Sequence, residues 1–350
     1  INETHKNLSS GPPGIPADHG KNRKKKGTGR FWTVIIAEAV LIVILLAVMG
    51  NRSGDGVFSG KEKGKDEFPE LEEIWSYGSG KTKVVRIPLS GMIELENGNA
   101  SFGSSAGSAD YALKSIRRAT YDPEVKGIIL TINSGGGGIT ASDVLYRALL
   151  DFKKEQDGRR IISIFGDVSA SGAYYVAMAS DRIIAHPTSV VGSIGVLIHR
   201  IDLRGLAEKI GMKDLTVKSG KNKRLLDPLS EFTEEQRAMI QNMVDQMHTR
   251  FVTIVADGRQ RPVEEIRKIA DGRIFTASRA MELDLVDSTG YWKDAMETAA
   301  DLLSVDTVKV YRYQQEFSFS SLFSAAAGWN PTESLYRRFA RTRLLYLWQP

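Results

Sequence analysis

Apolar and polar positions alternate with two different periods in the central part of the chain. Runs of apolar and β-branched residues with the period of a strand are separated by segments with helical spacing. Strands are expected at 83–93, 127–133 and 160–166, and helices at 108–120 and 139–155. The run GIILTIN at 127–133 is apolar throughout, as in a strand that is covered on both faces. The pattern predicts an α/β fold with mainly parallel strands.

The second half of this region continues the pattern with shorter elements. We expect a short helix at 171–180, strands at 182–187, 190–198 and 213–218, a helix at 202–210, a long amphipathic helix at 233–256, and a mostly helical segment at 262–301. The glycine run at 135–138 is expected to be a loop between the strand at 127–133 and the helix at 139–155.

Residues 31–49 form an apolar run that contains a single charge, Glu38, and predict a transmembrane helix. The basic cluster at 21–30 would keep the N-terminus in the cytoplasm and place the body outside the cytoplasmic membrane. A cleavable signal peptide is the alternative, but its apolar region is about 7–15 residues long and ends at a small-x-small site. This run is longer and ends in Ala47-Val48-Met49, so we interpret it as an uncleaved, single-pass anchor in the cell membrane.

Composition then suggests the limits of the other parts. The Pro-, Gly- and Lys-rich residues 1–30 predict a disordered, basic cytoplasmic tail, and residues 50–80 predict a linker. Residues 81–305 form the expected folded domain, and residues 306–350 the C-terminal tail.

The net charge of +5 lies in the two ends of the chain. The N-terminal 30 residues carry a balance of +5 and residues 329–350 one of +3, so the remainder is slightly acidic. This distribution argues against a body that binds nucleic acid. The absence of Cys excludes disulfides, thiolate zinc sites and Cys nucleophiles, and no HExxH or close His/Asp/Glu cluster predicts a metal. We expect no cofactor.

Two segments carry candidate chemistry. In NSGGGGI (133–139), bare backbone N–H groups could stabilise an oxyanion or hold a phosphate. In SASGAYY (169–175), Ser171 precedes a short helix, where a helix N-cap is the ordinary role of a serine. These two segments by themselves leave each alternative open.

A nucleophilic serine needs a base. The histidines of the body, His186, His199 and His248, lack a clear orienting carboxylate nearby and are better explained as structural. A desolvated lysine can replace histidine, and VKSGKNKRLLDP (217–228) offers three lysines, although a solvated basic loop explains the same residues.

The chain resembles the bacterial signal peptide peptidase A family, in its short, single-domain form from Gram-positive bacteria. The resemblance rests on INSGGGGI (132–139), DVSASGAYYVA (167–177), SVVGSIGV (189–196), KSGKNKRLLDP (218–228) and ADGRIFTASRAMELDLVD (270–287). It covers roughly residues 81–305 and the anchor. It implies a membrane-anchored Ser-Lys endopeptidase with the ββα superhelix of the Clp protease and crotonase superfamily.

The resemblance also implies a role for individual residues. Ser171 matches the nucleophile, Lys223 the general base and Ser193 the serine that orients the lysine. The N–H groups of Gly137 or Gly138, together with that of Gly172, match the oxyanion hole. The chain departs from the family at Gly135, where proline is usual, and this change should loosen the glycine segment.

Further expectations follow from the resemblance. Substrates would be hydrophobic peptides such as signal-peptide remnants in the membrane, and the assembly a dome-shaped homo-octamer in which Ser171 and Lys223 come from different protomers. The tail at 306–350 could be an amphipathic helix on the membrane or a neighbour, or could mimic a substrate in the active-site groove. A crotonase-type acyl-CoA enzyme and an inactive peptide-binding scaffold are the alternative functions.

Overall fold

The computed structural model of the chain describes residues 69, 71–95, 108–314 and 344–347, the last four by their backbone only. The chain divides into two compact units, residues 1–62 and 63–350, and every described residue belongs to the second. The predicted anchor at 31–49 lies outside the described residues. Within the described ranges, no helix is both long and apolar enough to cross a membrane.

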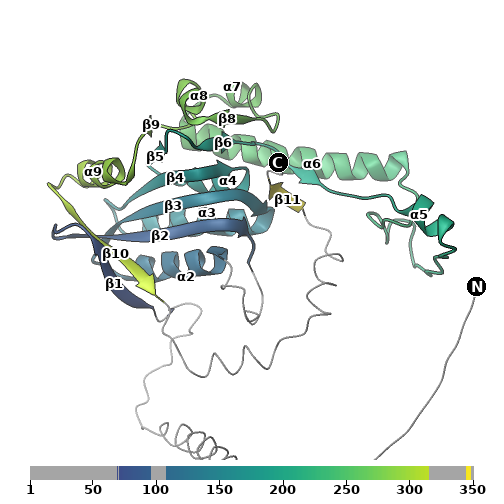
Figure 1. Cartoon of the computed structure of the whole chain (residues 1–350), viewed down its shortest axis with the longest axis horizontal. Coiled ribbons are helices and arrows are strands. Elements are labelled where there is room, and N and C mark those ends of the chain that lie inside the picture. The colour runs from purple at the N-terminus through teal and green to yellow at the C-terminus, as the bar shows by residue number, and fades with distance from the viewer. Residues whose placement is uncertain (1–68, 70, 96–107, 315–343, 348–350) are drawn as a thin grey trace, which may run out of the picture. The chain divides into compact units, whose positions relative to one another are not determined.

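A mostly parallel sheet forms the centre of the second unit and confirms the predicted α/β class (Figure 1). From edge to edge, its main strands are β1 (Glu72–Tyr77), β10 (Val308–Gln314), β2 (Thr82–Ile93), β3 (Val125–Gly138), β4 (Arg160–Ala170), β5 (Arg182–Ala185) and β9 (Ser288–Thr289). Only β1 in this series is antiparallel to its neighbour. The sheet therefore extends beyond 81–305 on both sides, because β1 and β10 pair with each other and β10 pairs with β2.

Helices cover both faces of this sheet. The larger apolar cluster contains residues of α2 (Ser108–Tyr121), α3 (Ile139–Glu155), α4 (Gly172–Ala177) and α6 (Glu234–Arg259). The smaller cluster is formed with α9 (Trp292–Leu302). Ile128 and Leu130 of β3 belong to the first cluster and Ile129 to the second, which explains why this strand is apolar at successive positions.

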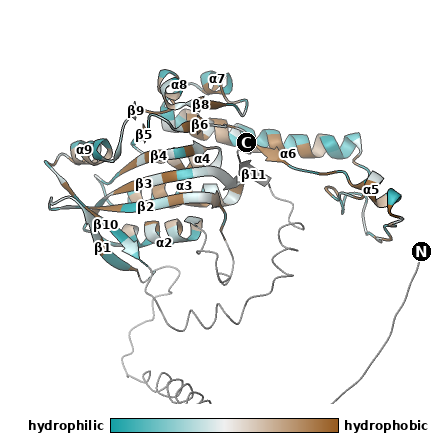
Figure 2. Cartoon of the chain, in the orientation of Figure 1, coloured by the Kyte–Doolittle hydropathy of each residue, from teal (hydrophilic) through white to brown (hydrophobic). Residues whose placement is uncertain are grey.

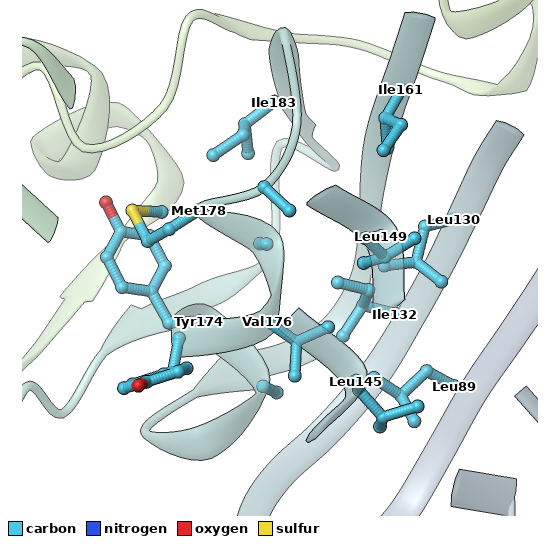
Figure 3. Packing of buried hydrophobic residues seen from close by; sticks show 14 of the residues in the cluster. Leu89, Leu130, Ile132, Leu145, Leu149, Ile161, Tyr174, Val176, Met178 and Ile183 are labelled. Atoms are coloured by element: carbon cyan, nitrogen blue, oxygen red, sulfur yellow. The ribbon is translucent and has the colours of Figure 1, made fainter. Parts of the chain in front are cut away.

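The side chains between sheet and helices are tightly buried. Figure 3 shows Leu130 and Ile132 of β3 beside Leu145 and Leu149 of α3 and Val176 of α4, and none of the five is more than 1% exposed. Figure 2 shows the same distribution along the chain, with hydrophobic residues gathered on β2, β3 and β4. This packing supplies the rigid support on which the ends of the strands can carry a site.

The remaining elements are short, apart from the long helix α6. They are β6 (Val190–Gly192), β7 (Leu197–Ile198), α5 (Arg204–Lys209), α7 (Val263–Arg267), β8 (Ile274–Thr276), α8 (Ala277–Glu282) and β11 (Leu344–Leu347). Helix α6 begins with a capping box, in which Thr233 accepts a hydrogen bond from the Gln236 N–H and the Gln236 side chain accepts from the Thr233 N–H. The long helix predicted at 233–256 is thus confirmed.

Three expectations about local structure are wrong. Residues 135–138 continue strand β3, since strands on both sides bond their backbone. The run 190–198 is split into β6 and β7, because Gly192 and Ser193 both have positive φ, 108° and 51°. Residues 213–218 form no strand and are exposed, because they have no strand partner among the described residues of this chain.

Candidate active site

Strands β2, β3 and β4 change register at the same level, near the carboxyl ends of β3 and β4. The β2–β3 pairing shifts between Ser90 and Met92, and the β3–β4 pairing between Ile132 and Ser134. Beyond this level lie the glycine run of β3 and, directly after β4, Ser171. The irregularity therefore separates the regular sheet from the segments that the sequence singled out.

Ser171 stands between β4 and α4 in a backbone conformation that is rare for residues other than glycine, with φ 54° and ψ −121°. Its N–H donates to the Gly192 carbonyl at 2.8 Å, and its carbonyl accepts from the Tyr175 N–H at 2.9 Å. These two bonds hold the turn on both sides. A strained serine between a buried strand and a helix is a common arrangement for an exposed or substrate-facing hydroxyl.

The hydroxyl of Ser171 does not cap the helix. Serine occupies the N-cap position of α4, but no side-chain capping bond forms. The residue is 1% exposed, and among the described residues its Oγ has no hydrogen-bond partner. The N-cap explanation is therefore wrong. A buried hydroxyl without a partner is costly and calls for an explanation such as catalysis, so Ser171 remains the candidate nucleophile.

The glycine run lies in the sheet beside this turn. Gly137 pairs with Ile93 of β2 on one side. A Cβ at Gly137 would lie 2.2 Å from the Ile93 carbonyl oxygen, whereas at Gly138 the nearest atom would be 3.6 Å away. Only glycine fits at position 137, because a side chain there would enter the neighbouring backbone. The Gly136 N–H is taken by Ser134 Oγ, so the candidate oxyanion donors at this site are the amides of Gly137 and Gly138 and the N–H of Gly172, which as the first residue of α4 lacks an acceptor within the helix.

The other face of the glycine run is paired with β11. Leu345, Tyr346 and Leu347 pair antiparallel with Gly138, Gly137 and Gly136. On its far side, β11 pairs antiparallel with Leu197 and Ile198 of β7. A four-residue extended peptide from the chain's own tail therefore lies between the glycine run and β7, in the position in which an extended ligand would add to the sheet.

Ser193 follows the Gly192 carbonyl that accepts from Ser171, so the sheet brings the two serines together. Its φ of 51° is also in the left-handed region. Its own N–H donates to the Arg273 carbonyl at 2.8 Å, and the residue is buried. The backbone on both sides of the turn that carries Ser171 is thus held by strand β6 and the segment before β8.

Lys223 is not brought to Ser171 within this chain. It lies in residues 199–230, which we call the arm, and is exposed. Ser171 Oγ has no partner in the part of the chain that the structure describes, so the Lys223 amine does not bond it within one chain. Lys221 forms an ion pair with Glu235 at 2.7 Å, and Lys218 donates to the Lys221 carbonyl. The sequence reasoning placed Ser171, Ser193 and the glycines in one site, but the lysine stands apart.

Charged groups next to Lys223 organise the arm. Arg224 bonds Asp214 and Asp227, and Arg200 donates to the carbonyls of Asp227 and Ser230. The hydrogen bonds from the Thr216 side chain and from Arg224 lower the pKa of Asp214 to about 2. The Lys223 segment is therefore held in turns by its neighbours, and within the described ranges the lysine side chain forms no hydrogen bond or ion pair.

The histidines are engaged elsewhere. His186 Nδ1 lies 2.8 Å from Thr188 Oγ1, and its ring contacts Tyr291 edge-on. His248 Nε2 lies 2.7 Å from the Ala270 carbonyl oxygen, and His199 is exposed. Across the described part of the chain, no group of three His, Asp or Glu side chains could hold a metal ion.

Sequence reasoning missed two polar side chains at the register change. Ser134 and Asn133 bond the irregular backbone of β3 and β4, and both were passed over as part of the glycine motif. Their position directly before the glycine run was the available clue, because polar residues at the end of a buried strand need partners.

Known peptidases are similar to this chain over most of its described part. The chain is 33% identical over 261 residues to "Putative signal peptide peptidase SppA" of Enterococcus faecium, covering 74% of this chain and 75% of that protein. The profile described as "Peptidase family S49" matches residues 153–306. The chain belongs to peptidase family S49.

Further relatives of this S49 peptidase come from other organisms. It is 33% identical over 238 residues to a "Putative protease" of Synechocystis sp., covering 68% of this chain and 80% of that protein. It is 31% identical over 219 residues to "Serine protease SPPA, chloroplastic" of Arabidopsis thaliana, covering 62% of this chain and 32% of that protein. The chain is thus a serine peptidase, a hydrolase, as the resemblance implied.

Proposed function

We propose that this S49 peptidase is a membrane-anchored endopeptidase that cleaves hydrophobic peptides with a Ser-Lys dyad. The observation that carries the proposal is the Ser171 turn, with its positive φ and its buried, unbonded hydroxyl beside the glycine run. We also propose that the fold is of the Clp protease and crotonase type. The mostly parallel sheet, with the candidate site near the carboxyl ends of its strands, is compatible with this type of fold.

The chemistry follows from the groups present. Neutral Lys223 accepts the proton of Ser171, and Ser171 Oγ attacks the carbonyl carbon of the scissile bond. The amides of the glycine run and of Gly172 hold the oxyanion while the C–N bond breaks, and the protonated lysine returns its proton to the leaving amine. Water then attacks the acyl ester and gives its proton to Lys223. The ester C–O bond breaks as Lys223 passes this proton to Ser171 Oγ, and the acid is released.

We propose that the lysine reaches the serine of a second copy of the chain. Two observations support this assignment: Lys223 is exposed in the single chain, and the arm around it presents apolar side chains to solvent. A lysine that acts as a base at neutral pH must lose its proton, and burial against a neighbour would favour the neutral form. The homo-oligomer, an octamer by resemblance, would then be required for activity.

The position of β11 supports an extended peptide as substrate. A peptide that pairs with both the glycine run and β7 has its backbone held between two strands. We propose that substrates bind as β11 does and that the tail competes with them. Signal-peptide remnants in the membrane would suit an enzyme whose anchor, at 31–49, keeps it at the same surface.

The test is hydrolysis of a fluorogenic Leu/Ala/Phe peptide by the full chain in detergent. Ser171→Ala and Lys223→Ala should each abolish turnover, and Lys221→Ala, a change of the same type two residues away, should retain it. Hydrolysis by Ser171→Ala at the rate of the parent chain would contradict the proposal. If the parent chain is inactive even without residues 315–350, the inactive scaffold becomes the better explanation, and turnover of an acyl-CoA thioester would favour a crotonase-type enzyme.

A mixing experiment tests the shared dyad. Ser171→Ala chains and Lys223→Ala chains are each inactive, but a 1:1 mixed ring would restore sites in which one copy gives the serine and its neighbour the lysine. Random mixing gives four equally frequent pairings of neighbouring copies, and only one of them joins an intact Ser171 to an intact Lys223. About a quarter of the parent activity should therefore return. No recovery after verified subunit exchange would place both residues in one chain.

A further inference from the structure

Ser134 lies at the junction of the regular sheet and the glycine run. It is 2% exposed, and neither the sequence motifs nor the family resemblance assigns it a role. It directly precedes Gly135, the first glycine of the run. A side chain at this position can restrain glycine backbone that has no side chains of its own.

The hydroxyl of Ser134 makes two hydrogen bonds across the register change. It donates to the Gly91 carbonyl at 2.5 Å and accepts from the Gly136 N–H at 3.1 Å. Gly91, with φ 70°, belongs to the irregular part of β2, and Gly136, with φ 104°, begins the segment of β3 that pairs with β11. One side chain thus joins β2 and β3 at the point where the register of their pairing changes.

The register change between β2 and β3 affects the direction in which the glycine amides point. Between Ser90 and Met92 of β2 there is one residue, whereas the matching partners Asn133 and Gly136 of β3 are separated by two. The extra residue makes a bulge on β3, and a bulge re-aims the backbone that follows it. Glycine backbone is the most freely rotating of all, so the direction of the amides after the bulge depends on the hydrogen bonds that hold it.

We propose that Ser134 is a positioning residue that fixes the direction of the oxyanion-binding amides. This inference rests on the proposed function of the glycine run. The serine hydroxyl fixes the bulge of β3 through its hydrogen bonds to the Gly91 carbonyl and the Gly136 N–H. Its effect on the amides passes through the Gly136 backbone.

The same level of the sheet contains a second restraint on β4, which strengthens the argument. Asn133 Oδ1 accepts from the Val168 N–H at 3.1 Å, and its Nδ2 donates to Asp167 at 3.0 Å. Asn133 thus holds the irregular part of β4 that leads to Ser171, as Ser134 holds the glycine run. The two neighbouring residues point to opposite strands, so the nucleophile and the oxyanion amides share one junction.

The test compares Ser134→Ala with Ser163→Ala in the full chain. Ser163 of β4 is a matched control, because it is also fully buried and its hydroxyl lies 2.7 Å from that of Ser180, away from the glycine run. Ser134→Ala should lower kcat for a fluorogenic peptide about tenfold or more, with KM changed less than about twofold, because misdirected oxyanion donors weaken only the transition state. Ser163→Ala should leave both constants near those of the parent chain.

Two further measurements separate positioning from a general structural role. A peptide aldehyde, whose adduct with the serine carries an oxyanion, should bind Ser134→Ala more weakly by the same factor as kcat falls, and Ser134→Thr, which keeps the hydroxyl, should recover part of the loss. Amide hydrogen exchange at 136–138 should accelerate in Ser134→Ala but not in Ser163→Ala, and this readout does not depend on activity.

The outcomes distinguish this inference from the proposed function. If Ser171→Ala is inactive while Ser134→Ala keeps the parent kcat, aldehyde affinity and exchange rates, the positioning role is wrong and the Ser-Lys chemistry stands. If Ser134→Ala accelerates exchange at 136–138 while Ser171→Ala retains activity, the restraint exists but the glycine run does not serve the proposed reaction. A loss of kcat in Ser163→Ala equal to that in Ser134→Ala would reduce the effect to lost packing.

Discussion

Apolar side chains are buried in the central sheet but exposed in the arm at 199–230. In the sheet, successive residues of β3 such as Ile128, Ile129 and Leu130 are fully buried. In the arm, Leu215 is 86% and Val217 98% exposed. Figure 2 shows hydrophobic residues in both regions, but only the sheet has helices on its two faces.

Polar side chains hold the turns of the arm. The side chains of Arg200, Arg224 and Asp227 bond one another or the backbone of the arm, while the apolar Leu215 and Val217 lie exposed. Exposed apolar side chains are costly to hydrate, and a surface of this kind is typical of a segment that packs on a partner. The proposed contact between copies of the chain would explain the contrast with the buried sheet.

The largest difference should appear in stability. Leu130→Ala removes a fully buried side chain and should lower the free energy of unfolding by about 2–5 kcal/mol, because a cavity remains in the sheet packing. Leu215→Ala, the same change in the arm, should alter it by less than about 0.5 kcal/mol in the separated chain. Urea unfolding of both variants at low protein concentration measures the contrast. Equal losses would show that the arm is already packed within one chain.

Charge on the arm should act on assembly instead. Replacing Leu215 and Val217 together by Asp should lower peptide hydrolysis about tenfold or more, since buried carboxylates without partners would disrupt the proposed contact between copies. Met281→Asp, at a 43% exposed apolar residue of α8, serves as the control and should retain activity. Sedimentation and activity across a range of protein concentrations give the readout. Full activity of the double variant as a monomer would refute the role assigned to the arm.

Two adjacent tyrosines of α4 allow a comparison of two buried hydroxyl groups within the core. Tyr174 and Tyr175 are both fully buried, and the Tyr174 hydroxyl donates to the Leu285 carbonyl at 2.7 Å, whereas that of Tyr175 bonds Asp143. Asp143 of α3 also accepts from Arg250 of α6 at 2.5 Å. The Tyr175 N–H bonds the Ser171 carbonyl, so this network holds the nucleophile turn through α4.

Replacing either tyrosine by Phe should cost about 1–2 kcal/mol of stability, because each loses one buried hydrogen bond. Only Tyr175→Phe should lower kcat, by about three- to tenfold, since only its hydroxyl anchors the turn that carries Ser171. Thermal unfolding and steady-state kinetics of the two variants separate the effects. A similar fall of kcat in Tyr174→Phe would mean that α4 as a whole, not the Tyr175 anchor, positions the serine.

The smallest effect concerns an ion pair at the far end of the sheet. Burial opposes ionisation of Asp122, but hydrogen bonds from Lys83 and the Glu124 N–H outweigh it and hold the pKa of Asp122 below 3.8. A lowered pKa gives stability that is present above the unfolded value and is lost as the pH falls through the folded one. Asp122→Asn should therefore cost about 1 kcal/mol at pH 7 and progressively less below pH 4.

Thermal unfolding between pH 3 and 7 measures this dependence. Asp151→Asn is the control, because Asp151 forms an exposed pair with Arg147 on the surface of α3 and should contribute little at any pH. A constant difference between parent and Asp122→Asn across the range would contradict the role of the ionised carboxylate.

The local elements were predictable where one segment carried the whole pattern. Apolar spacing predicts the strands within 82–93 and 160–170 and the helices α2, α3 and α6. The apolar side chains that set this spacing are those that pack between the sheet and the helices. The glycine run was taken for a loop because glycine has little intrinsic strand preference, and only pairing on both sides makes it a strand. Strand β10 was assigned to the tail because no local pattern tells that a strand pairs with β2, far away in the sequence.

The candidate site divides in the same way. Resemblance of motifs to a known family singled out Ser171, Ser193 and the glycines, and the sheet places them together. The hydroxyl bonds of Ser134 and the anchoring of Tyr175 were not foreseen, because each joins residues that are distant in sequence and depends on strand register.

The sequence by itself determined the α/β class, the serine peptidase family and the candidate residues, because apolar periodicity and short motifs are local properties of the chain. The tertiary structure alone decided the strained turn at Ser171, the bulge held by Ser134, the pairing of β11 with the glycine run, and the separation of Lys223 from the serine. These depend on which backbone groups meet across the sheet, and a register is set by packing over the whole domain.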